Sequence, residues 1–435
     1  MARPFWFTKL LVQSGLARFL PVARRLTDGG TAYLHYYSDA VLAAPVEELL
    51  DAAYFPTAGP DVIDLNLAAP RFESSVSLGR VAADRRGNPP ARGLPELRNA
   101  ISELYLRRDG RIVDPEREVF VTHGATGAYS AALDAFVNPG DRVVLFDPCS
   151  PLFSLGAASR RADVYWVGTR NEAGHCRYEK RDLEKAMRRA KLLVFADPGN
   201  PTGASFDREE SDHILWLAKQ RDVLVFADES FGVQSRVSRS HTDGRVLTAG
   251  SVSQAWGLGS LRVGWLAGPR HLVQACSLTA NLHAPFVPTI CQQIAARAIS
   301  DPHADREDDM QKGQFVVDRL RSLGLEPESS TASYFAWCSV TSLRMDGRTF
   351  AERLLKEQQV LVRPGGVFGP SGTNRVRISF AAEDGRLREG LARLSAFVNG
   401  LNGKPMATPR TEVETDEVPV RPPWRDRSLA LPPRS

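Results

Sequence analysis

Residues 191–203 read KLLVFADPGNPTG, an apolar run that ends in an acidic residue and a glycine- and proline-rich turn. A related pattern returns at 222–231, which read DVLVFADESF. Short runs of Val, Leu and Phe without polar alternation predict strands that are buried on both faces, as in a mostly parallel sheet. The turns that follow such strands are where open α/β sheets bind their ligands.

Similar short apolar runs occur before and after these two segments. Further predicted strands lie at 62–67, 119–124, 142–147, 162–167 and 261–268. Predicted helices lie between them at 94–108, 127–136, 182–190 and 209–220. Alternating strands and helices predict an α/β fold with helices covering a central sheet. We assign residues 61–304 to this large domain.

After about residue 302 the pattern changes to a smaller α+β arrangement. Predicted helices lie at 305–324, 350–360 and 385–401, and predicted strands at 333–340 and 375–381. We assign residues 31–60 and 305–402 to a small domain. Residues 403–435 are rich in proline and in charges of both signs, which predicts a disordered tail.

Composition excludes several classes of protein. The chain has 435 residues, 43% of them hydrophobic, which suits two or three globular domains. The net charge of +4 is small for this length and gives no sign of nucleic-acid binding. The five cysteines form no C-x-x-C pair, which predicts reduced thiols, no metal site and a cytoplasmic protein.

The first 30 residues are apolar and basic, with no acidic residue before Asp28. Three interpretations stay open for this segment. It docks on its own protein or on a partner subunit, which we favour; it lies on a membrane surface; or it is a targeting segment.

Seven motifs occur in order along the chain. They are NPPARGLPELRNAI (88–101), VTHGATGAYSAAL (121–133), NPGDRVVLFDPCSPLF (138–153), DPGNPTG (197–203), ADESF (227–231), SVSQAWGLGSLRVGW (251–265) and RPGGVF (363–368). This set resembles the class I/II aminotransferases over roughly residues 60–400. The resemblance implies the fold-type I architecture, a large three-layer domain with a mostly parallel sheet and a smaller α+β domain. It also implies pyridoxal phosphate as cofactor and a homodimer with the active site at the subunit interface.

The resemblance assigns cofactor roles to residues in these motifs. Asp228 matches the carboxylate that pairs with the pyridinium nitrogen and keeps the ring protonated. Asn200 matches the donor to the phenolic oxygen of the ring. Gly124, Ala125 and Thr126 match the turn whose backbone N–H groups open a helix onto the phosphate.

Three more residues complete this expected site. Ser251 and Arg262 match the serine and arginine that bind the phosphate, and Arg377 matches the arginine that clamps a substrate α-carboxylate. Each also has a plain structural explanation: local hydrogen bonding for the serine and Arg262, and a surface ion pair for Arg377. The family role of Arg377 implies an amino-acid-like small-molecule ligand, but it does not identify the side chain of that ligand.

One position departs from the family in a way that changes the chemistry. The family reads S-x-S-K where this chain reads Ser251-Val252-Ser253-Gln254. The family lysine forms the Schiff base with the cofactor and then moves a proton, and a glutamine amide does neither. None of the eight lysines lies in a cofactor motif, so we expect conventional transamination to be severely impaired and any cofactor, pyridoxal or pyridoxamine phosphate, to be held non-covalently.

Other positions around the expected pocket also differ. Phe231 stands where a tyrosine often donates to the phenolic oxygen, and Ser150 where an aromatic ring usually stacks on the cofactor. Asn88 stands where a tyrosine often reaches the phosphate of the neighbouring subunit, and Ala68 replaces a glycine near the substrate.

Three functions stay open at this point. The protein binds the cofactor or a cofactor–substrate adduct without a tether, in a rebuilt pocket; it is a non-catalytic homologue that acts as a binding partner; or it is an enzyme that uses the emptied pocket without pyridoxal phosphate.

Overall fold

The computed structural model describes residues 61–66, 87–231, 244–300, 307–328 and 333–401. The predictions for residues 1–30, 31–60 and 403–435, and for Ala68, lie outside these ranges. In the described part, no helix is long and apolar enough to cross a membrane.

An eight-stranded sheet forms the centre of the larger body, and its strand order is β2-β9-β8-β7-β6-β3-β4-β5. The strands are β2 (Val119–Thr122), β3 (Arg142–Asp147), β4 (Asp163–Glu172), β5 (His175–Tyr178), β6 (Ala190–Ala196), β7 (Leu224–Asp228), β8 (Val246–Ser251) and β9 (Gly264–Ala267). The pairs from β4 through β3, β6 and β7 to β8 are all parallel. The predicted α/β fold with a mostly parallel sheet is therefore confirmed.

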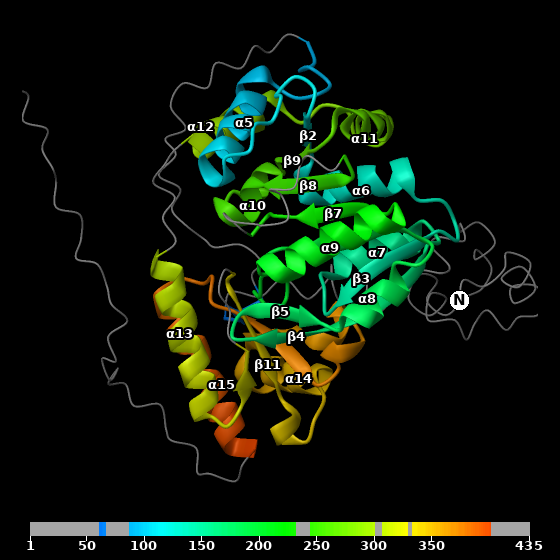
Figure 1. The fold of residues 1–435 in the computed structure, drawn as a ribbon. Coiled ribbons are helices and arrows are strands. Elements are labelled where there is room, and N and C mark those ends of the chain that lie inside the picture. The colour runs from blue at the N-terminus through cyan, green and yellow to red at the C-terminus, as the bar shows by residue number, and fades with distance from the viewer. Residues whose placement is uncertain (1–60, 67–86, 232–243, 301–306, 329–332, 402–435) are drawn as a thin grey trace, which may run out of the picture.

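Helices cover both faces and one end of this sheet, which gives the three-layer arrangement in Figure 1. On one face lie α6 (Gly124–Phe136), α7 (Pro151–Ser159) and α11 (Arg270–His283). On the other face lie α8 (Lys180–Ala186) and α9 (Arg208–Arg221). A pair formed by α5 (Pro95–Asp109) and α12 (Thr289–Ser300) packs over β2 and β9.

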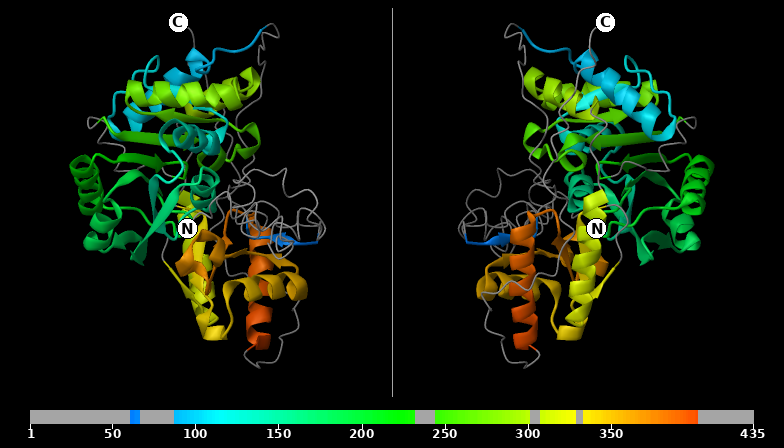
Figure 2. Two further views of the ribbon diagram at one scale, coloured as in Figure 1. Left: turned by 90° about the vertical axis from the view of Figure 1, so that its right-hand side faces the viewer. Right: turned by 90° about the vertical axis from the view of Figure 1, so that its left-hand side faces the viewer.

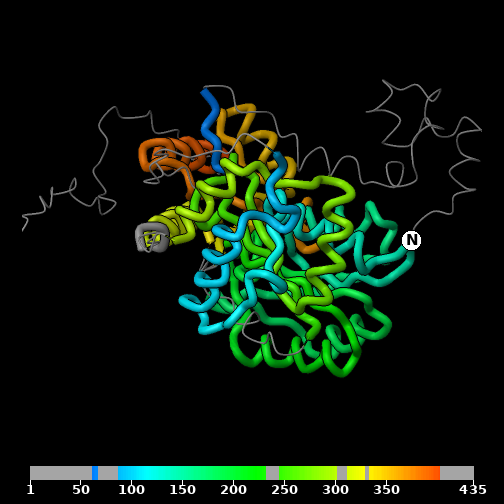
Figure 3. The backbone as a smooth tube through the Cα atoms, turned by 90° about the horizontal axis from the view of Figure 1, so that it is seen from above, coloured from blue at the N-terminus to red at the C-terminus, as the bar shows by residue number. Residues whose placement is uncertain are grey.

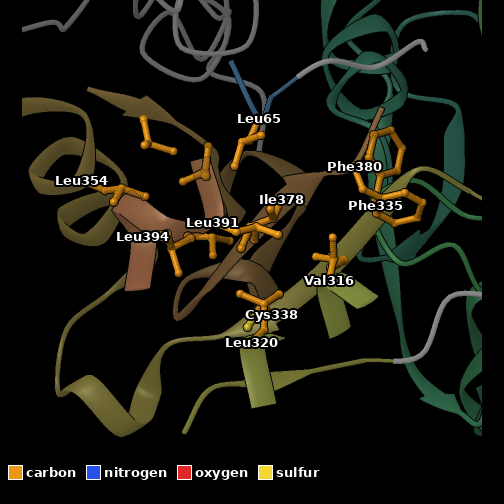
Figure 4. Packing of buried hydrophobic residues seen from close by; sticks show 14 of the residues in the cluster. Leu65, Val316, Leu320, Phe335, Cys338, Leu354, Ile378, Phe380, Leu391 and Leu394 are labelled. Carbon is orange, nitrogen blue, oxygen red and sulfur yellow. The ribbon is translucent and has the colours of Figure 1, made fainter. Parts of the chain in front are cut away.

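The second body is built on an antiparallel sheet with strand order β10-β11-β14-β13. Its strands are β10 (Glu326–Pro327), β11 (Phe335–Ser339), β13 (Arg363–Pro364) and β14 (Arg375–Ser379), and its helices are α13 (Glu307–Ser322), α14 (Gly347–Gln358) and α15 (Asp384–Leu401). Figure 4 shows its core, where Val316 of α13 lies near Phe335 and Ile378 of the sheet and Leu320 lies beside Cys338.

The first described strand, β1 (Ile63–Asp64), belongs to this second body by packing. It pairs in parallel with β12 (Val360–Leu361), and Ile63 and Leu65 are buried in the second core. Figures 2 and 3 show this blue segment beside the orange helix α15. We had placed residues 61–66 in the large domain; the structure differs because the short strand finds its only described pairing partner in β12.

Contacts at the end of β3 join the two bodies. The Asp147 carboxylate accepts hydrogen bonds from the Ser371 backbone N–H (3.1 Å) and hydroxyl (2.9 Å). Two residues on, the Cys149 N–H donates to the Phe368 carbonyl at 2.8 Å. The loop that carries the RPGGVF motif is therefore fixed against the large sheet.

Close packing at Gly250 of β8 gives a test of the fold. A β-carbon added at Gly250 would lie 2.3 Å from Cε2 of Trp265, whose indole N–H donates to the Tyr105 hydroxyl at 3.0 Å. We expect Gly250→Ala to lower the free energy of unfolding by roughly 1–3 kcal/mol, because the ring has to shift and strain or break this bond. Urea denaturation measures the change.

The matched control is Gly400→Ala on α15, where an added β-carbon meets nothing within 4 Å. This change should be neutral or stabilise by up to about 1 kcal/mol, as helical Gly→Ala changes do. Equal effects at the two positions would contradict the packing described for Trp265.

Candidate active site

The carboxyl ends of the parallel strands bring the predicted site residues to one edge of the large sheet. Ser150 follows β3, Asn200 follows β6, Asp228 ends β7 and Gln254 follows β8. Because β2 and β8 both run antiparallel to β9, helix α6 also begins at this edge. The loops at this edge are the expected ligand position in such a sheet.

The N-terminus of α6 offers a place for an anion. Gly124 begins the helix with a φ of 68°, and His123 before it makes no side-chain capping bond. The first turn carries no acidic residue, and the Thr126 side chain is exposed. The first N–H groups of a helix have no partner within the helix, and its dipole is positive at this end. The backbone of Gly124, Ala125 and Thr126 therefore suits a phosphate.

Arg262 brings a positive charge to this helix start. A β-carbon at Gly124 would lie 2.7 Å from Nη2 of Arg262, so the guanidinium occupies the space that the glycine leaves open. Nη1 of Arg262 donates to Ser253 Oγ at 3.3 Å and to the Gly259 carbonyl at 3.1 Å. The structure thus brings Arg262 and Ser253 together with the α6 turn.

Ser251 holds the turn on which Gln254 lies. Its hydroxyl accepts from the Ser253 N–H at 3.0 Å and donates to the Val263 carbonyl at 3.3 Å, which caps the short helix α10 (Val252–Ala255). The plain structural explanation for this serine is therefore satisfied, and its phosphate role stays a prediction.

Asp228 is a buried carboxylate with no cationic side chain paired to it among the described residues. Its Oδ1 accepts from the Ser230 N–H (3.0 Å) and hydroxyl (2.5 Å). Burial, and to a smaller extent the negative charge of Glu229, raises the pKa of Asp228, although the Ser230 hydrogen bonds act in the opposite direction. A carboxylate in this setting gains most from a cationic ligand group such as a protonated ring nitrogen.

Arg377 is a buried guanidinium that contacts neutral oxygens. Nη1 donates to Asn200 Oδ1 at 2.9 Å, and Nη2 donates to the Asn66 carbonyl at 3.0 Å. The guanidinium carbon lies 4.1 Å from the centre of the Phe335 ring and 5.1 Å from that of Phe368. Burial lowers the pKa of Arg377 to about 9, and Arg363 on the neighbouring strand adds to this effect.

Arg375, two residues before Arg377 on the same strand, has the ion pair that Arg377 lacks among the described residues. It pairs with Glu328 at 2.6 Å. Arg377 has no carboxylate among the described residues at such a distance, and its buried Nε makes no hydrogen bond. The surface ion-pair explanation for Arg377 is therefore wrong, since the side chain is buried and forms no ion pair. A carboxylate ligand would compensate this charge.

Gln254 lies between elements from both bodies. The Tyr334 hydroxyl, from the second body, donates to the Gln254 backbone carbonyl at 3.1 Å. The side-chain oxygen Oε1 of Gln254 is buried and accepts no hydrogen bond from any described residue. The described lysines are exposed or half-exposed and lie away from this turn. Lys191 is at the start of β6, the strand end opposite to the site, and the others are on helices α8, α9, α13 and α14: Lys180, Lys185, Lys219, Lys312 and Lys356.

The other predicted site positions that the structure describes, Phe231, Ser150 and Asn88, differ in their burial. Phe231 is buried and packs edge-on against Phe335, with ring centres 5.4 Å apart. Ser150 is half-buried at the start of α7 and makes no capping bond there. Asn88 is exposed. The aromatic ring of Phe231 is thus used in the contact between the two bodies.

Sequence reasoning missed residues that complete the site from the second body. Asn66, Tyr334, Phe335 and Phe368 contact Arg377 or Gln254, directly or through their backbone. Each lies in a segment that we had treated only as a strand or a motif. The available signal was the aromatic content of SYFAWCSV (333–340) next to the strand that carries Arg377.

Comparison with known proteins gives consistent results. Residues 61–394 match the family described as aminotransferase class I and II. The aspartate/prephenate aminotransferase of Thermus thermophilus is 28% identical over 355 residues, which cover 78% of this chain and 91% of that protein. The arginine–pyruvate transaminase AruH of Pseudomonas aeruginosa is 28% identical over 366 residues, 80% of this chain and 92% of that protein.

A solved structure shares the whole arrangement. The aspartate aminotransferase from Thermus thermophilus with maleate has a TM-score of 0.74 and 26% identity, covering 82% of this chain and 98% of that chain. The predicted fold-type I architecture is confirmed by this likeness.

The uncompensated charge of Asp228 predicts a stability effect. Its folded pKa is raised above the usual 3.8, so the carboxylate destabilises the ligand-free fold once the pH exceeds 3.8, and fully above the folded pKa. We expect Asp228→Asn to raise the melting temperature of the ligand-free protein at neutral pH, at about 2–4 °C per 1 kcal/mol for a domain of this size. Differential scanning calorimetry of the native and variant proteins at about pH 4 and at about pH 8 measures the difference in melting temperature.

Asp212→Asn on the exposed face of α9 serves as the control and should change little. A lower melting temperature for Asp228→Asn would mean that the carboxylate already has a cationic partner.

Proposed function

This chain belongs to the class I and II aminotransferase family, and we propose that it binds pyridoxal phosphate, pyridoxamine phosphate or a cofactor–substrate adduct without a covalent tether. The ligand that joins the cofactor is an amino-acid-like carboxylate. The single observation that carries the proposal is Gln254, which stands in the short helix α10 after β8, with its backbone carbonyl bound by Tyr334 and its side-chain oxygen without a donor among the described residues.

The described residues fit such a cofactor. The α6 N-terminus and Arg262 would hold the phosphate, and Asp228 would pair with the ring nitrogen. Asn200 has its Oδ1 engaged by Arg377, which leaves its amide nitrogen to donate to the phenolic oxygen. When bound, the cofactor supplies a ring that withdraws electrons from an attached amino acid.

Arg377 supports an amino-acid-like ligand. Its guanidinium carbon lies 4.1 Å from the centre of the Phe335 ring and 5.1 Å from that of Phe368, and no described carboxylate forms an ion pair with it. A planar guanidinium binds a planar carboxylate through paired hydrogen bonds. No described residue of this site indicates which side chain the ligand carries.

Gln254 argues against conventional transamination. An amide nitrogen is not nucleophilic and does not titrate near neutral pH, so it neither forms a Schiff base nor carries a proton. The described lysines lie on helices or, for Lys191, at the start of β6 opposite to the site; Lys180 pairs with Glu209 and Lys312 with Asp384. The relatives named as aminotransferases therefore indicate the ancestry of the pocket, and we propose different chemistry for this chain.

An apolar surface supports the predicted homodimer. Leu278 and Leu282 on α11 and Phe286 and Ile290 beyond it are exposed, with Leu282 80% accessible. Large apolar side chains gathered on one face are typical of protein interfaces. We propose that a second copy of this chain covers them.

The dimer proposal predicts a change of mass on substitution. Leu282→Glu should convert the protein to a monomer, because a charge would be buried at the interface. Light scattering coupled to gel filtration measures the mass. Trp216→Glu, at an exposed aromatic on α9, is the matched control and should leave the mass unchanged. A dimer that persists in Leu282→Glu would place the interface elsewhere.

The cofactor proposal is tested with Gln254→Lys. Incubated with pyridoxal phosphate, the native chain should take up the cofactor and lose it on dialysis. The Gln254→Lys chain should stay yellow after dialysis and gain the mass of a pyridoxyl group after borohydride reduction, with peptide mapping to residue 254. Spectra and intact mass read both outcomes.

If neither chain takes up the cofactor, the proposal fails and the non-catalytic homologue becomes the explanation. If the native chain is itself labelled stoichiometrically by borohydride at one lysine, another residue holds the cofactor and the role given to Gln254 is wrong.

A further inference from the structure

The side chain of Gln254 carries a hydrogen-bond acceptor at the position of the family lysine. Its Oε1 is buried, yet no described donor reaches it. The amide therefore presents a desolvated acceptor, and a buried acceptor without a donor destabilises a fold until a ligand supplies one.

The turn that carries this amide is held from two sides. The Tyr334 hydroxyl fixes the Gln254 carbonyl, and the Arg262 guanidinium binds the hydroxyl of Ser253 one residue earlier. Ser251 caps the same turn through the Ser253 N–H. The backbone from which the amide extends is thus fixed before any ligand arrives, which lowers the entropic cost of using it.

The two forms of the cofactor differ at the group that would replace the missing tether. The aldehyde form offers an oxygen that only accepts hydrogen bonds. The amine form offers N–H donors and a positive charge, and hydrogen bonds from charged donors are shorter and stronger than neutral ones. Two acceptor oxygens facing each other repel, whereas an amine facing an amide oxygen is attracted.

We infer that this site selects pyridoxamine phosphate over pyridoxal phosphate, with Gln254 Oε1 accepting a hydrogen bond from the amine. The inference rests on the proposed function, because it concerns the same pocket. The primary amine of this form would condense with a carbonyl compound, forming a C=N bond and releasing one water, so the ligand class is a 2-oxo acid or a related ketone. The carboxylate of such a compound meets Arg377 as before.

Isothermal titration calorimetry with three ligands tests this inference. They are pyridoxamine phosphate, pyridoxal phosphate and 4′-deoxypyridoxine phosphate, which keeps the ring and phosphate but lacks the reactive group. The full-length native chain should bind pyridoxamine phosphate at least about tenfold more tightly than either of the others, which corresponds to 1.4 kcal/mol.

Two variants separate the amide from the rest of the pocket. Gln254→Met has a similar length but no acceptor, and it should bind all three ligands within about threefold of one another. Gln254→Glu keeps an acceptor oxygen and adds negative charge, so it should keep or increase the preference for the amine. Thermal shifts of the unliganded variants control for folding.

The outcomes distinguish the two proposals. Equal binding of all three ligands by the native chain overturns the inference and leaves the non-covalent cofactor site in place. Tighter binding of pyridoxal phosphate also overturns it, because the amide would then present its nitrogen. Binding of none of the three overturns the proposed function itself.

Discussion

A buried positive charge determines how the two bodies of this chain meet. Arg377 comes from the sheet of the second body, and its guanidinium reaches Asn200 at the edge of the large sheet. Burying a guanidinium costs on the order of several kcal/mol unless polar groups and aromatic faces surround it. Phe335, Phe368 and the oxygens of Asn66 and Asn200 provide this environment. Much of the interface around the site is therefore built to hold one side chain.

The two charged groups of the site depend on different ligand groups. Arg377 lacks an anion and Asp228 lacks a cation among the described residues, and they come from different bodies. Neither compensates the other, so each keeps its charge available at the cost of stability in the ligand-free protein. A ligand with a cationic ring at one end and a carboxylate at the other would satisfy both.

The sequence was sufficient for the large sheet and insufficient for several of its neighbours. Runs such as 142–147 and 191–197 are purely apolar, and the structure has strands there. β8 reads VLTAGS, whose threonine, glycine and serine hide a buried strand, and we missed it. We also missed α7, α11 and α12. In α11 the signal was present, because Leu272, Val273 and Cys276 recur at helical spacing and form its buried stripe. The site residues of the motifs were placed at one edge because parallel strands bring their ends together. Tyr334 and Phe368 lie in segments whose aromatic residues were visible, but the side chains that they meet depend on how the two bodies pack.

The pairing of β1 with β12 has a consequence for the order of folding. Ile63 lies beside Val360, so the second body uses segments from both ends of the described chain. The large sheet uses only the residues between them and can form while the ribosome is still adding the rest. The second core cannot close until residue 360 has been made, and closing so long a loop carries an entropic cost that only its own packing repays. During synthesis, the half of the site that carries Asp228 therefore exists before the half that carries Arg377.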